Sequence, residues 1–299
     1  MSRKSSLDTL SSNERKIIDL RQYGFQNVVV LGKYNYTQAK EQLPLHTHRS
    51  MMEICFCSKG EQEYEVNENV YKIKGGDLFV TYPGEPHGTG KFPEEKGELY
   101  WIIIRINKKN TPTQFLRFEG ELAEEWQNQL LQLPRLFKGN SQLKPMLEKI
   151  INFKIDKKNL FSLISMQHLI AGYLLEVINC SKKEIVYKQS GKIVKVNNFL
   201  EAHLDEPVSV PELARVAGLS VSRFKSWFKQ ETGTTPLDYA LKYKITKAKK
   251  LLKKTKASVT SIAFETGFPN SQYFATVFKK FTGFSPTAYK THIVDSLDS

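Results

Sequence analysis

The sequence predicts an α+β protein with a sheet-rich amino-terminal part, a helical segment after it, and an all-helical carboxyl-terminal domain. Glycine, proline and aromatic residues divide the first 120 residues into short alternating segments typical of strands. Residues 121–182 repeat apolar side chains at helical spacing. Residues 209–289 contain one helix-turn-helix unit twice. A chain of 299 residues is long enough for two domains with separate cores.

The strands expected in the first 120 residues are short and separated by tight turns. They cover residues 28–31, 53–57, 62–66, 71–73, 77–81 and 99–106. Many short strands of this kind are typical of a small barrel or a jelly roll. We therefore assign residues 1–120 to a barrel domain.

Two groups of residues in this barrel resemble the two motifs of the cupin fold. The first group is His46, His48, Glu53 and Gly60, and the second is Gly76, Pro83, Gly84 and His87. Tyr82 stands where the second motif often has proline. The resemblance implies a cupin-like barrel.

Three imidazoles and one carboxylate form a donor set that suits zinc, iron, manganese or nickel. The same side chains can instead line a ligand pocket through hydrogen bonds, or lie at strand ends beside a turn. We expect a pocket without a metal or another cofactor. If a metal is bound, its candidate ligands are His46, His48, Glu53 and His87.

A ligand pocket in a small barrel combines a few polar groups with aromatic walls. The expected lining residues are His46, His48, Glu53, Tyr64, Tyr82, His87 and Trp101. Aromatic faces beside side chains that bind hydroxyl groups suit a sugar or a related polyol. The alternative is that the tyrosine and tryptophan rings only fill the core.

Residues 121–182 are apolar along one side of the expected helices. The apolar stripe consists of Leu160, Leu163, Ile164, Ile170, Tyr173, Leu174, Val177 and Ile178. Such a stripe packs against its own domain or forms an interface with a second chain. His168 is expected in the core or at its edge, and the polar residues 183–190 are the expected linker.

The carboxyl-terminal part repeats one pattern. Ser209, Leu213, Ala214, Gly218 and Leu219 correspond to Ser258, Ile262, Ala263, Gly267 and Phe268, 49 positions later. Ser220, Phe224, Phe228, Lys229, Gly233, Pro236 and Tyr239 correspond to Asn270, Phe274, Phe278, Lys279, Gly283, Pro286 and Tyr289, 50 positions later. The slip of one residue falls at the expected turn, where an insertion is tolerated. We assign helix-turn-helix motifs to residues 209–232 and 258–282, each with a polar N-cap before its second helix.

Aromatic residues fall on one face of each second helix and leave a polar face opposite. The outward residues are Ser222, Lys225, Ser226 and Lys229 in the first unit, and Gln272, Ala275, Thr276 and Lys279 in the second. A small, polar and basic face suits a helix laid in the major groove of double-stranded DNA.

The distribution of charge also indicates a nucleic-acid partner. Residues 191–299 carry a net charge of +8, against +5 for the longer part before them. Between the two motifs, one expected helix without acidic residues carries Lys242, Lys244, Lys247, Lys249, Lys250, Lys253, Lys254 and Lys256. Unpaired like charges repel one another unless an anion is near, and the DNA phosphate backbone supplies that anion.

Residues 191–290 resemble the DNA-binding domain of the AraC family of bacterial transcription regulators. The residues that match the family signature are Ala263, Gly267, Phe268, Tyr273, Phe274, Phe278, Lys279, Gly283, Pro286 and Tyr289. We expect base contacts from Ser222, Arg223, Lys225, Ser226, Gln272, Tyr273, Ala275 and Thr276. We expect contacts to the DNA backbone from Lys229, Lys244, Lys247, Lys250 and Lys279.

The chain departs from the family pattern at four positions. Family members often have Arg where this chain has Ser226 or Thr276, and usually Arg where it has Lys244 and Lys290. Serine and threonine lack the two-pronged donor group that reads guanine. The operator of this chain therefore cannot be taken from relatives.

The resemblance implies a regulator whose amino-terminal cupin binds a small-molecule effector, possibly a sugar. It also implies a homodimer formed through the helix that follows the barrel, contact with RNA polymerase, and activation rather than repression. Residues 291–299 are the expected tail. We expect no catalytic residues and no enzymatic activity.

Two other classes of protein are alternatives to a transcription regulator, and each has properties that distinguish it. A metal-dependent cupin oxygenase or isomerase fused to a DNA-binding tail would hold stoichiometric metal and turn over a substrate without DNA. A general DNA-compacting protein would need neither a sensor barrel nor two different reading helices.

The composition fits a cytoplasmic protein without a membrane partner. Residues 1–13 are polar and serine-rich, unlike a signal peptide. By residue type, no stretch reaches the roughly 18 apolar residues of a membrane helix. The chain has three cysteines, Cys55, Cys57 and Cys180, and an odd number suits a reducing compartment.

Overall fold

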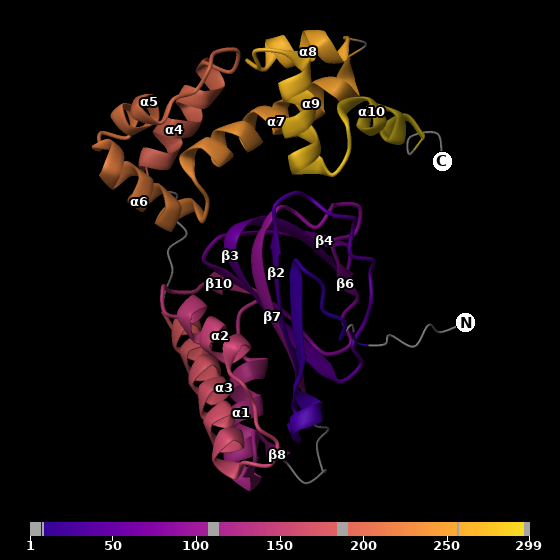
Figure 1. Cartoon of the computed structure of the whole chain (residues 1–299), viewed down its shortest axis with the longest axis vertical. Coiled ribbons are helices and arrows are strands. Elements are labelled where there is room, and N and C mark those ends of the chain that lie inside the picture. Colours follow the sequence, from indigo (N-terminus) through magenta and orange to yellow (C-terminus); the bar gives the residue numbers. More distant parts are fainter. Residues whose placement is uncertain (1–6, 8, 107–113, 184–190, 256, 296–299) are drawn as a thin grey trace. The chain divides into compact units, whose positions relative to one another are not determined.

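The computed structural model describes residues 7, 9–106, 114–183, 191–255 and 257–295. Its contacts divide the chain into two units (Figure 1). The first consists of residues 1–35, 42–92 and 97–185, and the second of residues 186–299 with the short segments 36–41 and 93–96. Lys256, most of the expected linker, and residues 296–299 of the expected tail lie outside the described residues.

The first unit is built on an antiparallel sheet. Its strands follow the order β1 (Arg15–Asp19), β2 (Val28–Tyr36), β7 (Gly97–Arg105), β3 (Met51–Val66), β5 (Asp77–Thr81) and β10 (Leu136–Lys138). The second half of β3 pairs with β4 (Asn69–Lys74) and β6 (His87–Gly88). Two short strands, β8 (Gln114–Phe115) and β9 (Phe118–Glu119), pair with each other, and a 3-10 turn covers Leu20–Tyr23.

Strand β3 corrects the prediction of two separate strands at residues 53–57 and 62–66. The two segments form one strand of 16 residues, whose register against β7 shifts between Cys57 and Lys59. Gly60 follows the shift with a φ of 90°, which a residue with a side chain rarely adopts. The glycine therefore marks a bulge inside a strand, not the turn between two strands.

Side chains alternate between the two faces of the sheet. Met52, Ile54 and Phe56 of β3 belong to the large core cluster on the helical side. Glu53 and Cys55, between them in sequence, lie on the opposite face, inside the barrel. This alternation decides which predicted pocket residues can meet.

Three helices cover the helical side of the sheet: α1 (Gly120–Leu131), α2 (Leu143–Asn152) and α3 (Leu160–Ser181), as Figure 1 shows. The expected helical segment 121–182 therefore also contains a strand, β10, which pairs with β5. Three residues are too few to give a strand period that differs visibly from a helix.

Helix α3 corrects the expectation that no segment is long and apolar enough to cross a membrane. It has 22 residues with a mean hydropathy of 1.4, which meets that test by length and composition. A core helix of a soluble domain meets the same test. Met166, Ile170, Tyr173 and Val177 of α3 are fully buried in the core shared with the sheet.

The second unit is helical. Its helices are α4 (Gly191–Ala202), α5 (Val210–Val216), α6 (Val221–Thr232), α7 (Pro236–Lys254), α8 (Val259–Glu265), α9 (Ser271–Thr282) and α10 (Pro286–Asp295). One core cluster lies among α4, α5 and α6, and a second among α8 and α9. Helix α7 contributes Ala240 to the first and Ile245, Ala248 and Leu252 to the second. The prediction of an α+β chain with two tandem helix-turn-helix motifs is confirmed.

Candidate nucleic-acid interface and ligand pocket

The first candidate reading helix is α6. Ser220 caps it by accepting a hydrogen bond from the backbone N–H of Arg223. Phe224 and Phe228 are fully buried and fix the rotation of the helix about its axis. The polar residues predicted to face DNA are all exposed: Ser222, Arg223, Lys225, Ser226 and Lys229.

Helix α9 repeats this arrangement. The Asn270 side chain accepts a hydrogen bond from the backbone N–H of Tyr273 at 2.7 Å, and Phe274 and Phe278 are fully buried. Gln272, Tyr273, Thr276 and Lys279 are exposed, and Ala275 is half-buried. The Thr276 hydroxyl donates to the carbonyl oxygen of Gln272 at 3.0 Å, so its oxygen remains as an acceptor.

Lys244 corrects one predicted DNA contact. Its side chain points into the second unit, with 4% of its surface exposed. The ammonium group donates to the carbonyl oxygens of Leu204 (2.8 Å), Glu206 (2.6 Å) and Gly267 (3.3 Å). Burial lowers the pKa of Lys244 to about 8. Lys244 therefore ties the turn of the second motif to the segment that follows α4, and it is not available to a phosphate.

Two further lysines also have partners within the second unit. Lys247 forms an ion pair with Glu201, which also accepts a hydrogen bond from the hydroxyl of Tyr243. Lys290 donates to the carbonyl oxygen of Ala257 at 3.0 Å. Lys250 and Lys253 are exposed. The sequence suggested that the lysines of α7 are unpaired, but some of them have partners. Among the phosphate contacts predicted on this helix, Lys250 is therefore the best placed.

In the first unit, four of the predicted pocket residues come together inside the barrel. One possible ligand atom from each of His46, His48, Glu53 and His87 lies within 4.8 Å of the corresponding atom of the other three. Glu53 is on β3 and His87 on β6, while His46 pairs with His87 through two backbone hydrogen bonds of 2.9 Å. The three imidazole rings have centroids 4.4 to 5.4 Å apart. We call these four residues the histidine cluster.

Hydrogen bonds orient the histidine cluster. Nδ1 of His46 lies 3.0 Å from the carbonyl oxygen of Pro44, and Nδ1 of His87 lies 2.8 Å from that of Glu85. Nε2 of His87 and Nε2 of His48 lie 3.6 and 4.0 Å from the same carboxylate oxygen of Glu53.

The electrostatics of the histidine cluster favour an ionised Glu53. Burial raises the pKa of Glu53, but the three imidazoles, His87 first, outweigh it and lower the pKa to about 2. Burial lowers the pKa of His46 and lowers that of His48 to about 4. Burial has the largest single effect on the pKa of His87 and lowers it, but the hydrogen bond and charge of Glu53, together with those of Glu85, outweigh burial and raise the pKa. The cluster therefore holds an ionised carboxylate facing three imidazole rings.

Two predicted aromatic residues lie on the same inner face. Tyr64 stacks on Phe79 with ring centroids 5.1 Å apart, and its hydroxyl contacts the thiol of Cys55 at 3.8 Å. Trp101 packs directly against Gly32, where an added Cβ would lie 2.1 Å from the indole ring. Both rings are almost completely buried, so they form walls of the barrel interior.

Tyr82 corrects the predicted pocket. It continues the face of Val80 rather than that of Thr81, and it packs against the core on the helical side of the sheet. Its hydroxyl donates to the carbonyl oxygen of Leu133.

A separate cavity, lined by residues 24–28, 114, 116, 117 and 119, contains none of the predicted pocket residues.

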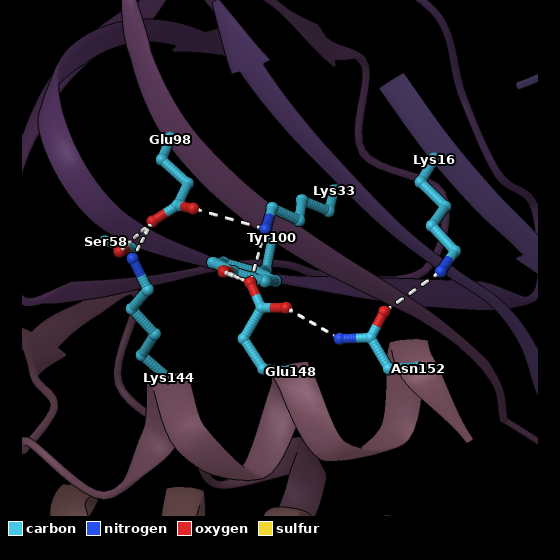
Figure 2. Close-up of polar contacts among 8 residues, drawn as sticks. All are labelled: Lys16, Lys33, Ser58, Glu98, Tyr100, Lys144, Glu148 and Asn152. Carbon is cyan, nitrogen blue, oxygen red and sulfur yellow. Dashed lines mark hydrogen bonds and ion pairs between the residues drawn. The ribbon is translucent and has the colours of Figure 1, made fainter. Parts of the chain in front are cut away.

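Sequence reasoning missed a polar network between the sheet and α2 (Figure 2). Lys33 and Tyr100 both contact the carboxylate of Glu148, and Lys33 also pairs with Glu98 at 3.3 Å. Glu98 in turn contacts Lys144 and accepts a hydrogen bond from Ser58 at 2.6 Å. These residues are far apart in sequence, so no motif spacing could have grouped them. The network fastens α2 to the sheet.

Comparisons with known proteins match both units. Residues 30–171 match the family described as AraC-like ligand binding domain, and residues 213–292 match the family described as helix-turn-helix domain. The uncharacterised HTH-type transcriptional regulator YdeC of Bacillus subtilis is 23% identical over 83% of this chain and 86% of its own length. The HTH-type transcriptional activator RhaR of Mannheimia succiniciproducens is 25% identical over 84% of this chain and 88% of its own.

Similar solved structures include one DNA complex. The DNA-binding domain of AdpA bound to a target DNA is 29% identical and covers 34% of this chain and 93% of that domain, with a TM-score of 0.33. ToxT of Vibrio cholerae is 11% identical over 93% of this chain and 98% of its own, with a TM-score of 0.35.

Proposed function

The chain belongs to the AraC family of DNA-binding transcription regulators, and we propose that it activates promoters under the control of a small molecule bound in its barrel. It is a regulator rather than an enzyme, so the fused cupin oxygenase is not retained. The observation that carries the proposal is the duplicated motif, which presents two different polar helix faces, on α6 and α9. Activation is favoured because the relatives include proteins described as activators.

The length of α7 suits binding to one continuous operator. Its 19 residues span about 28 Å, and it contributes to the cores of both motifs. Successive major-groove segments on one side of B-DNA are about 34 Å apart. We therefore place α6 and α9 in successive major-groove segments. In this arrangement Ser222, Arg223, Lys225 and Ser226 on α6, and Gln272, Tyr273, Ala275 and Thr276 on α9, contact bases. Lys229, Lys247, Lys250 and Lys279 contact phosphates.

The proposed effector is a sugar or related polyol. The barrel interior combines the polar histidine cluster with the aromatic walls of Tyr64 and Trp101. Hydroxyl groups donate to and accept from imidazole and carboxylate groups, while the apolar face of a sugar ring packs on an aromatic side chain. We propose that the effector enters the barrel beside His46. His46 is more exposed than His87, to which it is linked by backbone hydrogen bonds.

The proposed assembly is a homodimer that acts in the cytoplasm and contacts RNA polymerase. Helix α3 begins with the exposed apolar side chains of Leu160, Phe161 and Ile164, while later members of its apolar stripe are buried. Exposed apolar groups that are close together in a helix are typical of a protein interface. We propose this end of α3 as the dimer contact.

We also keep the domain limits 1–120, 121–182, 183–190, 191–290 and 291–299 as proposals.

Competition binding tests the function directly. The full-length protein is titrated into labelled DNA from upstream of its own gene, at near-physiological salt, with scrambled DNA as competitor and a panel of sugars added in turn. We expect binding that survives the competitor and changes with one sugar. Equal loss to scrambled DNA would contradict sequence-specific regulation, and binding unchanged by every sugar would contradict the proposed effector class.

A further inference from the structure

We propose that the histidine cluster binds one divalent first-row transition-metal ion, through Nε2 of His46, His48 and His87 and one carboxylate oxygen of Glu53. This inference deepens the proposed function, because the ion would lie in the effector barrel. Its regulatory meaning rests on that function, although the binding of the ion does not.

The hydrogen bonds around the cluster leave the correct nitrogen atoms free. A carbonyl oxygen can only accept, so Nδ1 of His46 and Nδ1 of His87 must carry the protons that they share with Pro44 and Glu85. In a neutral ring, Nε2 then keeps its lone pair and can bind a metal. Metal-bound histidines in proteins are commonly fixed in this way, through the ring nitrogen that does not bind the ion.

The distances suit a shared ion better than direct hydrogen bonds. Nε2 of His87 and Nε2 of His48 lie 3.6 and 4.0 Å from Oε2 of Glu53, whereas an N–H···O hydrogen bond is about 2.9 Å long. Ligand atoms about 2.0 to 2.1 Å from a zinc ion lie about 3.4 Å apart when the geometry is tetrahedral. Small side-chain rotations would therefore bring the four donors to an ion.

Unsatisfied polar atoms at the cluster also indicate a missing partner. Nε2 of His87 is buried and has no hydrogen-bond partner among the described residues, and His87 is 2% exposed. Within the same described part of the chain, the buried hydroxyl of Thr81 has none either, and Thr81 lies directly opposite Glu53 in the register of β3 and β5. A buried polar atom without a partner costs folding free energy. A bound ligand would supply the missing partner of these two atoms.

The donor set selects the class of ion. Imidazole nitrogen atoms suit zinc, iron, nickel and cobalt, whereas calcium and magnesium prefer oxygen ligands. The thiol of Cys55 donates to Oε1 of Glu53 at 3.3 Å and so helps to orient the carboxylate. Four protein donors leave coordination positions for an oxygen atom of a small molecule when the ion takes five or six ligands. A hydroxyl-rich effector supplies such oxygen atoms.

Metal titration of the full-length protein without a polyhistidine tag tests the inference. The protein is stripped with chelator, dialysed, and titrated with Co²⁺ while the visible d–d absorption and the heat of binding are recorded. We expect one ion per chain and a spectrum typical of nitrogen and oxygen ligands. A stripped protein that gives neither a spectrum nor heat would overturn the proposal.

Variants locate the ion. His46→Gln changes a half-buried histidine of the histidine cluster, and Glu53→Gln keeps the shape of the carboxylate without its charge. Because loss of an outer-shell partner already weakens metal binding about 10- to 100-fold, we expect each variant to weaken Co²⁺ binding by more than about 10-fold. The control is His168→Gln, which we expect to leave binding unchanged. His168 lies outside the cluster and is exposed, which corrects the expectation that it belongs to the core or its edge.

Three results distinguish failure of this inference from failure of the proposed function. Unchanged Co²⁺ affinity in His46→Gln and Glu53→Gln would place the ion elsewhere and overturn the site, even if the wild-type protein binds metal. Operator binding by metal-free protein that never takes up Co²⁺ would refute the metal site alone. Co²⁺ binding without any preference for operator DNA would refute the regulator alone. Circular dichroism shows whether each variant is folded. If a variant is not folded, the number of Co²⁺ ions bound per wild-type chain decides whether the metal site exists.

Discussion

Lys225 and Lys250 carry the same charge on different helices, and they have different proposed roles. Lys225 lies on the exposed face of α6, and Lys250 on the exposed side of α7. We expect Lys225→Ala to reduce discrimination at one or two base pairs by about 1 to 3 kcal/mol. We expect Lys250→Ala to weaken binding to all DNA about equally and to reduce the salt slope by about one. Dissociation constants for operator and scrambled DNA at several salt concentrations measure both effects.

Equal effects of the two substitutions on operator and scrambled DNA would contradict the assignment of α6 as a reading helix. A salt slope that is unchanged in Lys250→Ala would remove Lys250 from the phosphate contacts.

Lys244 is expected to contribute to stability rather than to DNA binding. Lys244→Met leaves the carbonyl oxygens of Leu204 and Glu206 without their donor, so the free energy of unfolding should fall by about 1 to 3 kcal/mol. Burial lowers the pKa of Lys244 from 10.5 to about 8, so the unfolded chain binds more protons than the folded one between these pH values. The stability contributed by Lys244 therefore rises with pH in this window.

Denaturant unfolding between pH 7 and 10.5 measures this difference, with the exposed Lys253→Met as the control. A stability equal to that of the wild type, together with a reduced salt slope of DNA binding, would return Lys244 to the phosphate contacts.

Gly218 and Gly267 occupy the same position in the two motifs, and both have a φ of 67°. An alanine at either position is strained by about 1 to 2 kcal/mol. At Gly267 the added Cβ would also lie 2.7 Å from the carbonyl oxygen of Leu204, whereas at Gly218 nothing lies within 4 Å. We expect Gly267→Ala to lower the melting temperature more than Gly218→Ala, and equal shifts in a thermal melt would count against this packing.

At the scale of single residues, periodicity predicted the exposed faces of α6 and α9 but misplaced two side chains. Lys244 follows Ala240 and precedes Ala248 and Leu252 at steps of four residues, so it lies on the buried stripe of α7. The charge of Lys244 suggested that its side chain is exposed, whereas its position on α7 led to burial. Tyr82 lies on the helical side because side chains alternate along β5 and past its end.

Among the secondary-structure elements, α3 carries the clearest prediction about assembly. Its exposed residues Phe161 and Ile164 lie three positions apart and therefore on the same face. We expect Phe161→Glu and Ile164→Glu to shift the protein toward monomer, because each would bring a charge into an apolar contact. The matched control is Val70→Glu, which changes an exposed apolar residue on β4.

Light scattering at micromolar concentration measures this shift. A wild-type protein that is already monomeric under these conditions, or variants that keep the dimeric mass, would contradict the proposed role of α3.

Helices α6 and α9, the proposed reading helices, could be predicted as elements because each has a cap, an aromatic stripe and a glycine after its last turn. Gly233 and Gly283 end α6 and α9 with φ values of 69° and 79°. The short strands β1, β6 and β10 could not be predicted, because two to five residues give too little periodicity and their pairing partners are distant in sequence.

For the whole molecule, duplication and charge were enough to predict a DNA-binding tail, and the resemblance to AraC-type regulators implied the sensor before it. The spacing of the cupin-like motifs also predicted the residues of the histidine cluster. It could not predict their hydrogen bonds, because Pro44 and Glu85 receive those bonds through backbone atoms that carry no sequence signal. The network around Glu148 escaped prediction for a similar reason, since its members meet only after the sheet and α2 have packed.

A hydroxyl-radical footprint on DNA from upstream of the gene tests most directly whether one chain reads DNA through both α6 and α9. We predict two protected stretches for each bound chain, about one helical turn apart, which persist with scrambled competitor. We also predict that Lys225→Ala weakens protection in only one of the two stretches. Protection without this spacing, or protection lost equally to scrambled DNA, would contradict a tandem reading module.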